Sequence, residues 1–78
     1  MTPAQCRAAR GLVKLSQEEL ATKAEVGIVT VRQFEGDKAE PRRATLAALQ
    51  RALESAGVEF IDANGGGPGV RLKRKPKR

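Results

Sequence analysis

The sequence predicts a mainly α-helical fold in which four short helices are followed by a C-terminal β-hairpin. Three observations lead to this fold class. Apolar residues recur at three-to-four spacing in four segments before residue 57, and capping signals mark two of the helix starts. After residue 57 the pattern changes to two short apolar stretches around a glycine-rich loop. A chain of 78 residues supports one domain, which buries only about 60% of its unfolded surface.

The first helix is predicted from about Pro3 to Leu12. Thr2 and Gln5 have the spacing of a capping box, and Pro3 takes the first helical position, where proline is well tolerated. An inner stripe follows at helical spacing and consists of Cys6, Ala9, Arg10 and Val13.

The second and third helices are short and close together in sequence. Ser16 and Glu19 form a second capping box for a helix over 17–24, and a turn at residues 25–26 leads to a helix over 28–35. Gly36 ends this third helix. Its inner side carries Val31 and Phe34, and its opposite, exposed side carries Val29, Arg32 and Gln33.

A fourth helix is predicted over 43–56, with Leu46, Leu49 and Leu53 facing inward. Arg42 before it is a poor N-cap residue. The hairpin strands are expected at 58–62 and 70–72. Because an isolated two-stranded hairpin is marginal in water, this one must pack on the helices or pair with another chain.

Composition argues against catalysis and cofactors. The chain has no histidine, so Ser16 has no imidazole to activate it, and Cys6 is the single cysteine, which excludes an intrachain disulfide or a zinc cluster. We therefore predict no enzyme activity, no metal site and no cofactor. No apolar run approaches the roughly 20 residues of a membrane span, which predicts a cytoplasmic protein.

The positive charge is confined to one end of the sequence. Lys and Arg number 15 against 9 Asp and Glu, and residues 71–78 hold six of the basic groups, so residues 1–70 carry nine of each sign. The basic segment has three interpretations: an arm along a DNA backbone, a solvated segment without a specific role, or an incidental excess of charge.

One block carries a family resemblance. The residues at its start are Leu15, Ser16, Gln17, Glu18, Glu19, Leu20 and Ala21, and those that follow at fixed spacing are Val26, Thr30, Val31, Phe34 and Glu35. This pattern resembles the Cro/repressor-type helix-turn-helix proteins, the Xre family, over roughly residues 4–57. The resemblance implies a lambda repressor-like four-helix domain that binds duplex DNA and places the 28–35 helix in the major groove.

The resemblance also implies roles for individual residues. Base edges would be contacted by Ile28, Val29, Arg32 and Gln33. Phosphates would be contacted by Gln17, Thr30, Lys38, Arg42 and Arg43. Arg10 and Glu35 match a pair that forms a buried structural ion pair between the first and third helices.

Physical chemistry supports the base-contacting set independently. Gln33 has the amide that pairs with adenine, and Arg32 has the guanidinium that pairs with guanine, each giving about 1 to 3 kcal/mol of discrimination. Ile28 and Val29 offer only apolar contact to thymine methyl groups or fill the groove. The sequence departs from the family at Glu25, where glycine is usual because the turn needs a positive φ, and at Gly27, where Ser or Thr usually caps the helix.

The sequence therefore predicts a DNA-binding transcriptional regulator, most simply a repressor, located in the bacterial cytoplasm with the nucleoid. We expect residues 1–57 to form the DNA-binding domain, 58–73 to form a hairpin that is the dimer element of a homodimer, and 74–78 to form a basic tail. The alternative is an antitoxin-type module that binds a toxin partner protein as well as its own operator.

Overall fold

The computed structural model describes residues 1–63 and 65–73, so the predictions for the tail over 74–78 lie outside the described residues. It confirms the predicted fold class. The elements in order are α1 (Pro3–Val13), α2 (Gln17–Ala24), α3 (Ile28–Glu35), α4 (Arg43–Ser55), β1 (Val58–Ile61) and β2 (Gly69–Leu72). The second and third helices have the predicted bounds, while α1 is one residue longer and α4 one residue shorter than expected.

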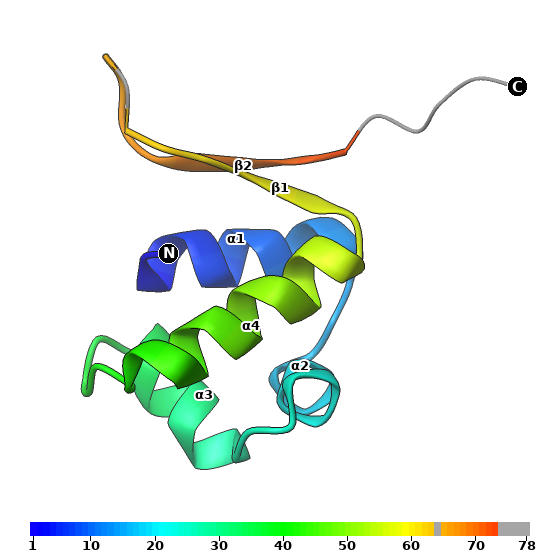
Figure 1. The fold of residues 1–78 in the computed structure, drawn as a ribbon, viewed down its shortest axis with the longest axis vertical. Helices are drawn as coiled ribbons and strands as arrows, with labels where there is room; N and C mark the ends of the chain where they lie inside the picture. The colour runs from blue at the N-terminus through cyan, green and yellow to red at the C-terminus, as the bar shows by residue number, and fades with distance from the viewer. Residues whose placement is uncertain (64, 74–78) are drawn as a thin grey trace, which may run out of the picture.

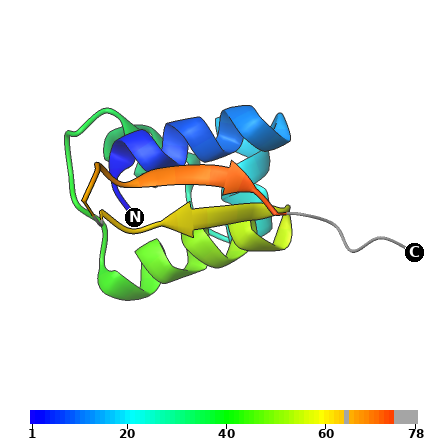
Figure 2. The ribbon, with the colours of Figure 1, turned by 90° about the horizontal axis from the view of Figure 1, so that it is seen from above.

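The hairpin forms one end of the molecule and the helices form the rest (Figure 1). The hairpin lies across α1 and α4, and α3 lies on the other side of these helices, at the opposite end of the long axis (Figure 1). Seen from above, β2 runs beside α1 and β1 beside α4 (Figure 2). The strands are antiparallel, with Val58 opposite Leu72 and Phe60 opposite Val70. The hairpin therefore packs on the helices, which is one of the two solutions that its marginal stability allows.

The core joins all four helices to the first strand. Its fully or almost fully buried members are Cys6, Ala9, Leu20, Ala21, Val31, Phe34, Leu49, Leu53 and Val58. The inward positions that periodicity predicts on the helices are buried or partly buried, and Leu46 and Val13 are partly buried beside this cluster. Ala21 is a small, almost fully buried residue on α2, which packs on both α3 and α4.

Local signals fix the helix ends as expected. Both capping boxes are present. The Thr2 hydroxyl accepts a hydrogen bond from the main-chain amide of Gln5, and the Ser16 hydroxyl accepts one from the main-chain amide of Glu19. Glu25 caps α2 in the left-handed region at φ 59°, where a side chain is strained. Helix α3 ends before Gly36, but Gly36 has φ −87° and the left-handed residue is Asp37 at φ 59°.

Gln5 connects α1 to the hairpin, which its role in the capping box does not predict. Its side-chain amide donates to the carbonyl oxygens of Ile61, at 3.3 Å, and Gly69, at 3.0 Å, while its Oε1 accepts from the Thr2 amide. Ile61 and Gly69 face each other across the two strands. The buried side-chain amide of Gln5 therefore holds both strands at the loop end of the hairpin.

Candidate nucleic-acid interface

The last residue of α3 is fixed to α1 through its carboxylate. Arg10 Nε donates to Glu35 Oε2 at 2.7 Å, and Arg10 Nη2 donates to Oε1 at 2.6 Å. The Glu35 side chain is 2% exposed and that of Arg10 is 20% exposed. The buried ion pair that the family resemblance implies is therefore present. It sets the position of the C-terminal end of α3 relative to α1.

Two further side chains complete this carboxylate site. The Cys6 thiol donates to Glu35 Oε2 at 3.1 Å, and the Gln17 amide donates to Oε1 at 3.0 Å. In addition, Arg7 donates to the main-chain oxygen of Glu35. Glu35 thus accepts hydrogen bonds from α1 and from the first residue of α2. We refer to Cys6, Arg10, Gln17 and Glu35 as the carboxylate cluster.

Within the cluster, hydrogen bonding keeps Glu35 and Arg10 ionised. Burial acts to raise the pKa of Glu35, but the hydrogen bonds from Arg10, Cys6 and Gln17 outweigh it and hold the pKa below its ordinary value. The hydrogen bond to Glu35 raises the pKa of Arg10. Burial, together with the adjacent Glu35, raises the pKa of the Cys6 thiol far above its ordinary value. Cys6 is therefore a neutral hydrogen-bond donor in the core and not a reactive thiolate.

The outward side of α3 carries three of the four predicted base-contacting residues. Val29, Arg32 and Gln33 are exposed, and Val29 is 56% exposed. Ile28 is half-buried and packs against the core, so it presents less surface than Val29 does. The exposed side of α3 therefore combines one apolar contact, one guanidinium and one amide.

The predicted phosphate-contacting residues surround α3 but differ in exposure. Lys38, Arg42 and Arg43 are exposed on the loop after α3 and at the start of α4. Thr30 is half-buried on α3. Gln17, also half-buried, directs its amide to Glu35, a contact that sequence reasoning missed because no local pattern connects the two residues.

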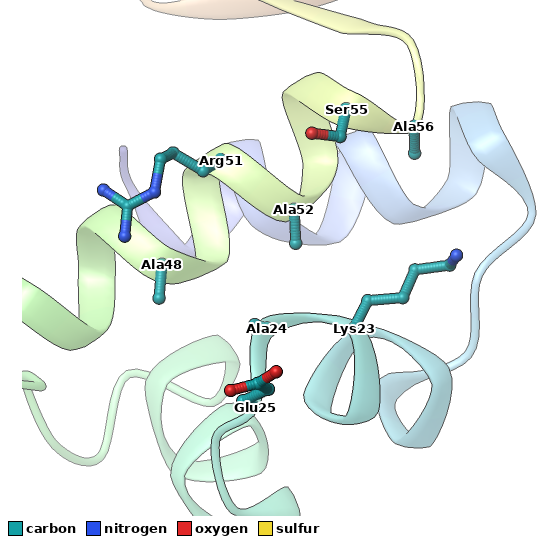
Figure 3. Close-up of a pocket in the computed structure, with 8 residues that line it drawn as sticks. All are labelled: Lys23, Ala24, Glu25, Ala48, Arg51, Ala52, Ser55 and Ala56. Carbon is teal, nitrogen blue, oxygen red and sulfur yellow. The ribbon is translucent and has the colours of Figure 1, made fainter.

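A hollow of about 490 Å³ lies between α2 and α4 (Figure 3). Alanine side chains line much of it, and Lys23, Glu25 and Arg51 add charge: the full lining is Lys23, Ala24, Glu25, Ala48, Arg51, Ala52, Ser55 and Ala56. Among residues 1–63 and 65–73, no group of three or more Cys, Asp or Glu side chains is placed to hold a metal ion. The same residues contain no helix long and apolar enough to cross a membrane.

Comparison with known proteins places this geometry in a family. A helix-turn-helix family model matches residues 7–60, which include all four helices except the first turn of α1. The chain belongs to the Cro/repressor-type helix-turn-helix family. No curated protein sequence matches the chain.

A solved structure supports the same assignment. The DNA-binding domain of the P22 c2 repressor, residues 1–76, determined in solution by nuclear magnetic resonance, is 33% identical and superposes with a TM-score of 0.63. The match covers 67% of this helix-turn-helix chain and 68% of the repressor domain.

Proposed function

We propose that this helix-turn-helix protein regulates transcription, most simply as a repressor, by binding a specific duplex DNA sequence with α3 in the major groove. The observation that carries the proposal is the exposed trio Val29, Arg32 and Gln33 on a helix whose end is fixed by the carboxylate cluster. A base-reading helix must be held in one orientation, because direct readout depends on hydrogen bonds of defined geometry.

The three side chains suit different bases. The guanidinium of Arg32 matches the O6 and N7 acceptors of guanine, and the amide of Gln33 matches the N6 and N7 groups of adenine. Val29 has no polar atom and offers its methyl groups to the thymine C5 methyl. Lys38, Arg42 and Arg43 would contact phosphates and set the register of the helix in the groove without choosing the sequence. Thr30 and Gln17 are secondary candidates for phosphate contact.

The decisive experiment selects bound sequences from a random DNA pool and then compares variants on the selected duplex and on random duplex. We expect Arg32→Ala and Gln33→Ala to weaken binding to the selected duplex by about 1 to 3 kcal/mol each, with a smaller loss on random duplex. Arg51→Ala is the matched control, since Arg51 is an exposed arginine in the hollow between α2 and α4. Equal losses on both duplexes for Arg32→Ala would contradict base reading.

We also propose that the protein acts as a homodimer, with the 58–73 hairpin contributing to the contact. The proposal rests on the aliphatic side chain of Leu72 on the hairpin, which is 53% exposed. A two-fold axis normal to the hairpin would keep both α3 helices on the same side of the dimer, where half-sites lie about 34 Å apart.

Sedimentation tests the dimer and its rival together. We expect a homodimer that Leu72→Glu converts to monomer, because a carboxylate there would be buried without a partner. The antitoxin interpretation instead requires a toxin protein that copurifies from the native cell in fixed ratio. A protein that sediments as a monomer at high concentration and copurifies with nothing would contradict both.

A further inference from the structure

We infer that the hollow between α2 and α4 is a docking groove for an amphipathic helix of a different protein, which carries acidic residues on both sides of a short apolar face. The hollow has a volume of about 490 Å³, and none of its lining residues belongs to α3. The inferred partner is therefore independent of the DNA that α3 is proposed to bind.

The floor of the hollow consists of alanine side chains. Ala48, Ala52 and Ala56 are four residues apart at the C-terminal end of α4, so they lie one above another over roughly 12 Å. Ala24 lines the hollow from α2 on the opposite side (Figure 3). A length of about 12 Å is two helical turns, which matches the i, i+3, i+4 and i+7 side chains by which a helix binds a groove. Because alanine side chains are short, larger aliphatic side chains of a partner helix have room in the hollow.

Three charged side chains border this floor. Lys23 and Arg51 come from the two opposite helices, and Glu25 follows the last residue of α2. The Arg51 guanidinium and the Lys23 ammonium lie at opposite ends of the hollow (Figure 3). None of the three forms an ion pair with another residue in 1–63 or 65–73. Two cations at the ends against one carboxylate favour a partner face that is acidic at both ends.

A second copy of this chain does not supply such a face. Among the residues that the structure describes, the exposed large aliphatic side chains are Leu12, Val29 and Leu72. Within three residues of each along the chain there is at least one Lys or Arg, and there is no Asp or Glu. Docking any of them in the hollow would bring cations toward Lys23 and Arg51. The complementary partner is therefore a different protein.

The lining does not suit other classes of partner. It has no aromatic side chain on which a nucleic-acid base could stack and no large aliphatic side chain that would enter a bilayer. The strands of the hairpin lie at the other end of the molecule from α2, so an extended peptide that adds to a sheet edge would not bind here (Figure 1). A groove with a helix on each side suits a helix.

The test uses two synthetic peptides as probes. The acidic probe is a capped, lactam-bridged helix with Leu at positions i, i+4 and i+7 and Glu on both sides of this leucine face, and the basic probe has Lys in place of each Glu. Each is titrated into isotopically labelled protein, and the backbone amide shifts are followed by nuclear magnetic resonance. The charge reversals Lys23→Glu and Arg51→Glu are compared with Lys14→Glu, which reverses an exposed lysine outside the hollow. Glu25→Gln removes the carboxylate, and urea denaturation verifies that every variant folds.

We expect the acidic probe to shift the amides of the lining residues and their neighbours. Each charge reversal in the hollow should weaken its binding by about threefold or more, because an attraction becomes a repulsion. The control reversal should stay within about 1.5-fold of wild type, and Glu25→Gln should strengthen binding by roughly twofold. The basic probe should bind the wild type at least about threefold more weakly than the acidic probe does.

Several outcomes would overturn the inference. Amide shifts confined to residues outside the lining would place the probe elsewhere, and no shifts at about 1 mM acidic probe would exclude a helix site. Equal affinity of the two probes, or an unchanged affinity after both charge reversals, would show that the charges of the hollow do not select the partner. Shifts of the lining amides when the protein alone is concentrated would assign the hollow to a second copy of the chain. Failure of base reading is a separate result, because it appears on DNA and in the Arg32→Ala variant.

Discussion

Arg10 holds Glu35 through two hydrogen bonds of 2.6 and 2.7 Å and so joins the last turn of α1 to the last residue of α3. Removing one partner of such a buried pair leaves the other charge without compensation. We expect Arg10→Met to lower the free energy of unfolding by about 3 kcal/mol, measured by urea denaturation with circular dichroism. Arg71→Met breaks an exposed pair with Glu59 and should leave this free energy nearly unchanged. Equal effects of the two substitutions would contradict the structural role of Arg10.

The same pair predicts an acid-sensitive contribution to stability. The pKa of Glu35 is lowered in the folded protein, so its stabilising contribution is complete above the ordinary value of 4.5 and is lost as the pH falls through the lowered value. Glu35→Gln lacks a carboxylate to titrate. We expect the wild type to exceed this variant in stability at pH 7 and the difference to shrink steadily below pH 4.5. A difference independent of pH would show that Glu35 is not ionised in the fold.

Gln5 provides a separate test of how the hairpin is held. Gln5→Glu keeps an oxygen for the Thr2 amide but turns a carboxylate toward the carbonyl oxygens of Ile61 and Gly69. We expect a loss of about 2 to 3 kcal/mol and faster amide hydrogen exchange across β1 and β2. Thr2→Ala, which removes only the cap, should cost about 1 kcal/mol and leave exchange in the hairpin unchanged. Slow exchange in the Gln5→Glu hairpin would argue against the tether.

The contacts of Gln5 and Gln17 show which part of the structure the sequence can predict. The start of α2 follows from Ser16 and Glu19, three residues apart, and the end of α3 follows from Gly36 as a helix-stopping residue. Signals of this kind involve residues close together in the sequence, so they can be recognised without knowledge of the fold. Gln5 lies 56 residues from Ile61, and Gln17 lies 18 residues from Glu35. Such pairings depend on how the helices pack, which spacing along the chain does not encode.

Part of the candidate site could likewise be predicted from the sequence, and part required the fold. Helical periodicity places Val29, Arg32 and Gln33 on the exposed side of α3, and the structure has them exposed. Ile28 was added to this set by the family resemblance alone, and the structure has it half-buried against the core. The ion pair between Arg10 and Glu35 was predicted from the family resemblance and not from the spacing of residues along the chain. The position of the hairpin relative to α3 could be determined only from the three-dimensional structure.

Substitution of Glu25 by glycine is expected to increase the stability of the fold. Glu25 occupies the left-handed region at φ 59°, where a residue with a Cβ atom costs about 1 to 2 kcal/mol relative to glycine. We expect Glu25→Gly to raise the thermal unfolding midpoint, measured by circular dichroism. Glu18→Gly is the control, because Glu18 lies inside the first turn of α2 and glycine there should lower the midpoint. A lower midpoint for Glu25→Gly would mean that the side chain makes a contribution larger than the strain.

Lys38, Arg42 and Arg43 give the last prediction, which separates phosphate contacts from base contacts. Each is exposed beside α3, and each phosphate contact contributes about 0.9 to the slope of log K against log salt on duplex DNA. We expect each substitution to glutamine to flatten the slope by about that amount and to weaken binding to selected and random duplexes equally. Arg51→Gln should leave the slope unchanged, since Arg51 lines the hollow between α2 and α4. A loss confined to the selected duplex would reassign that residue from the phosphate backbone to a base edge.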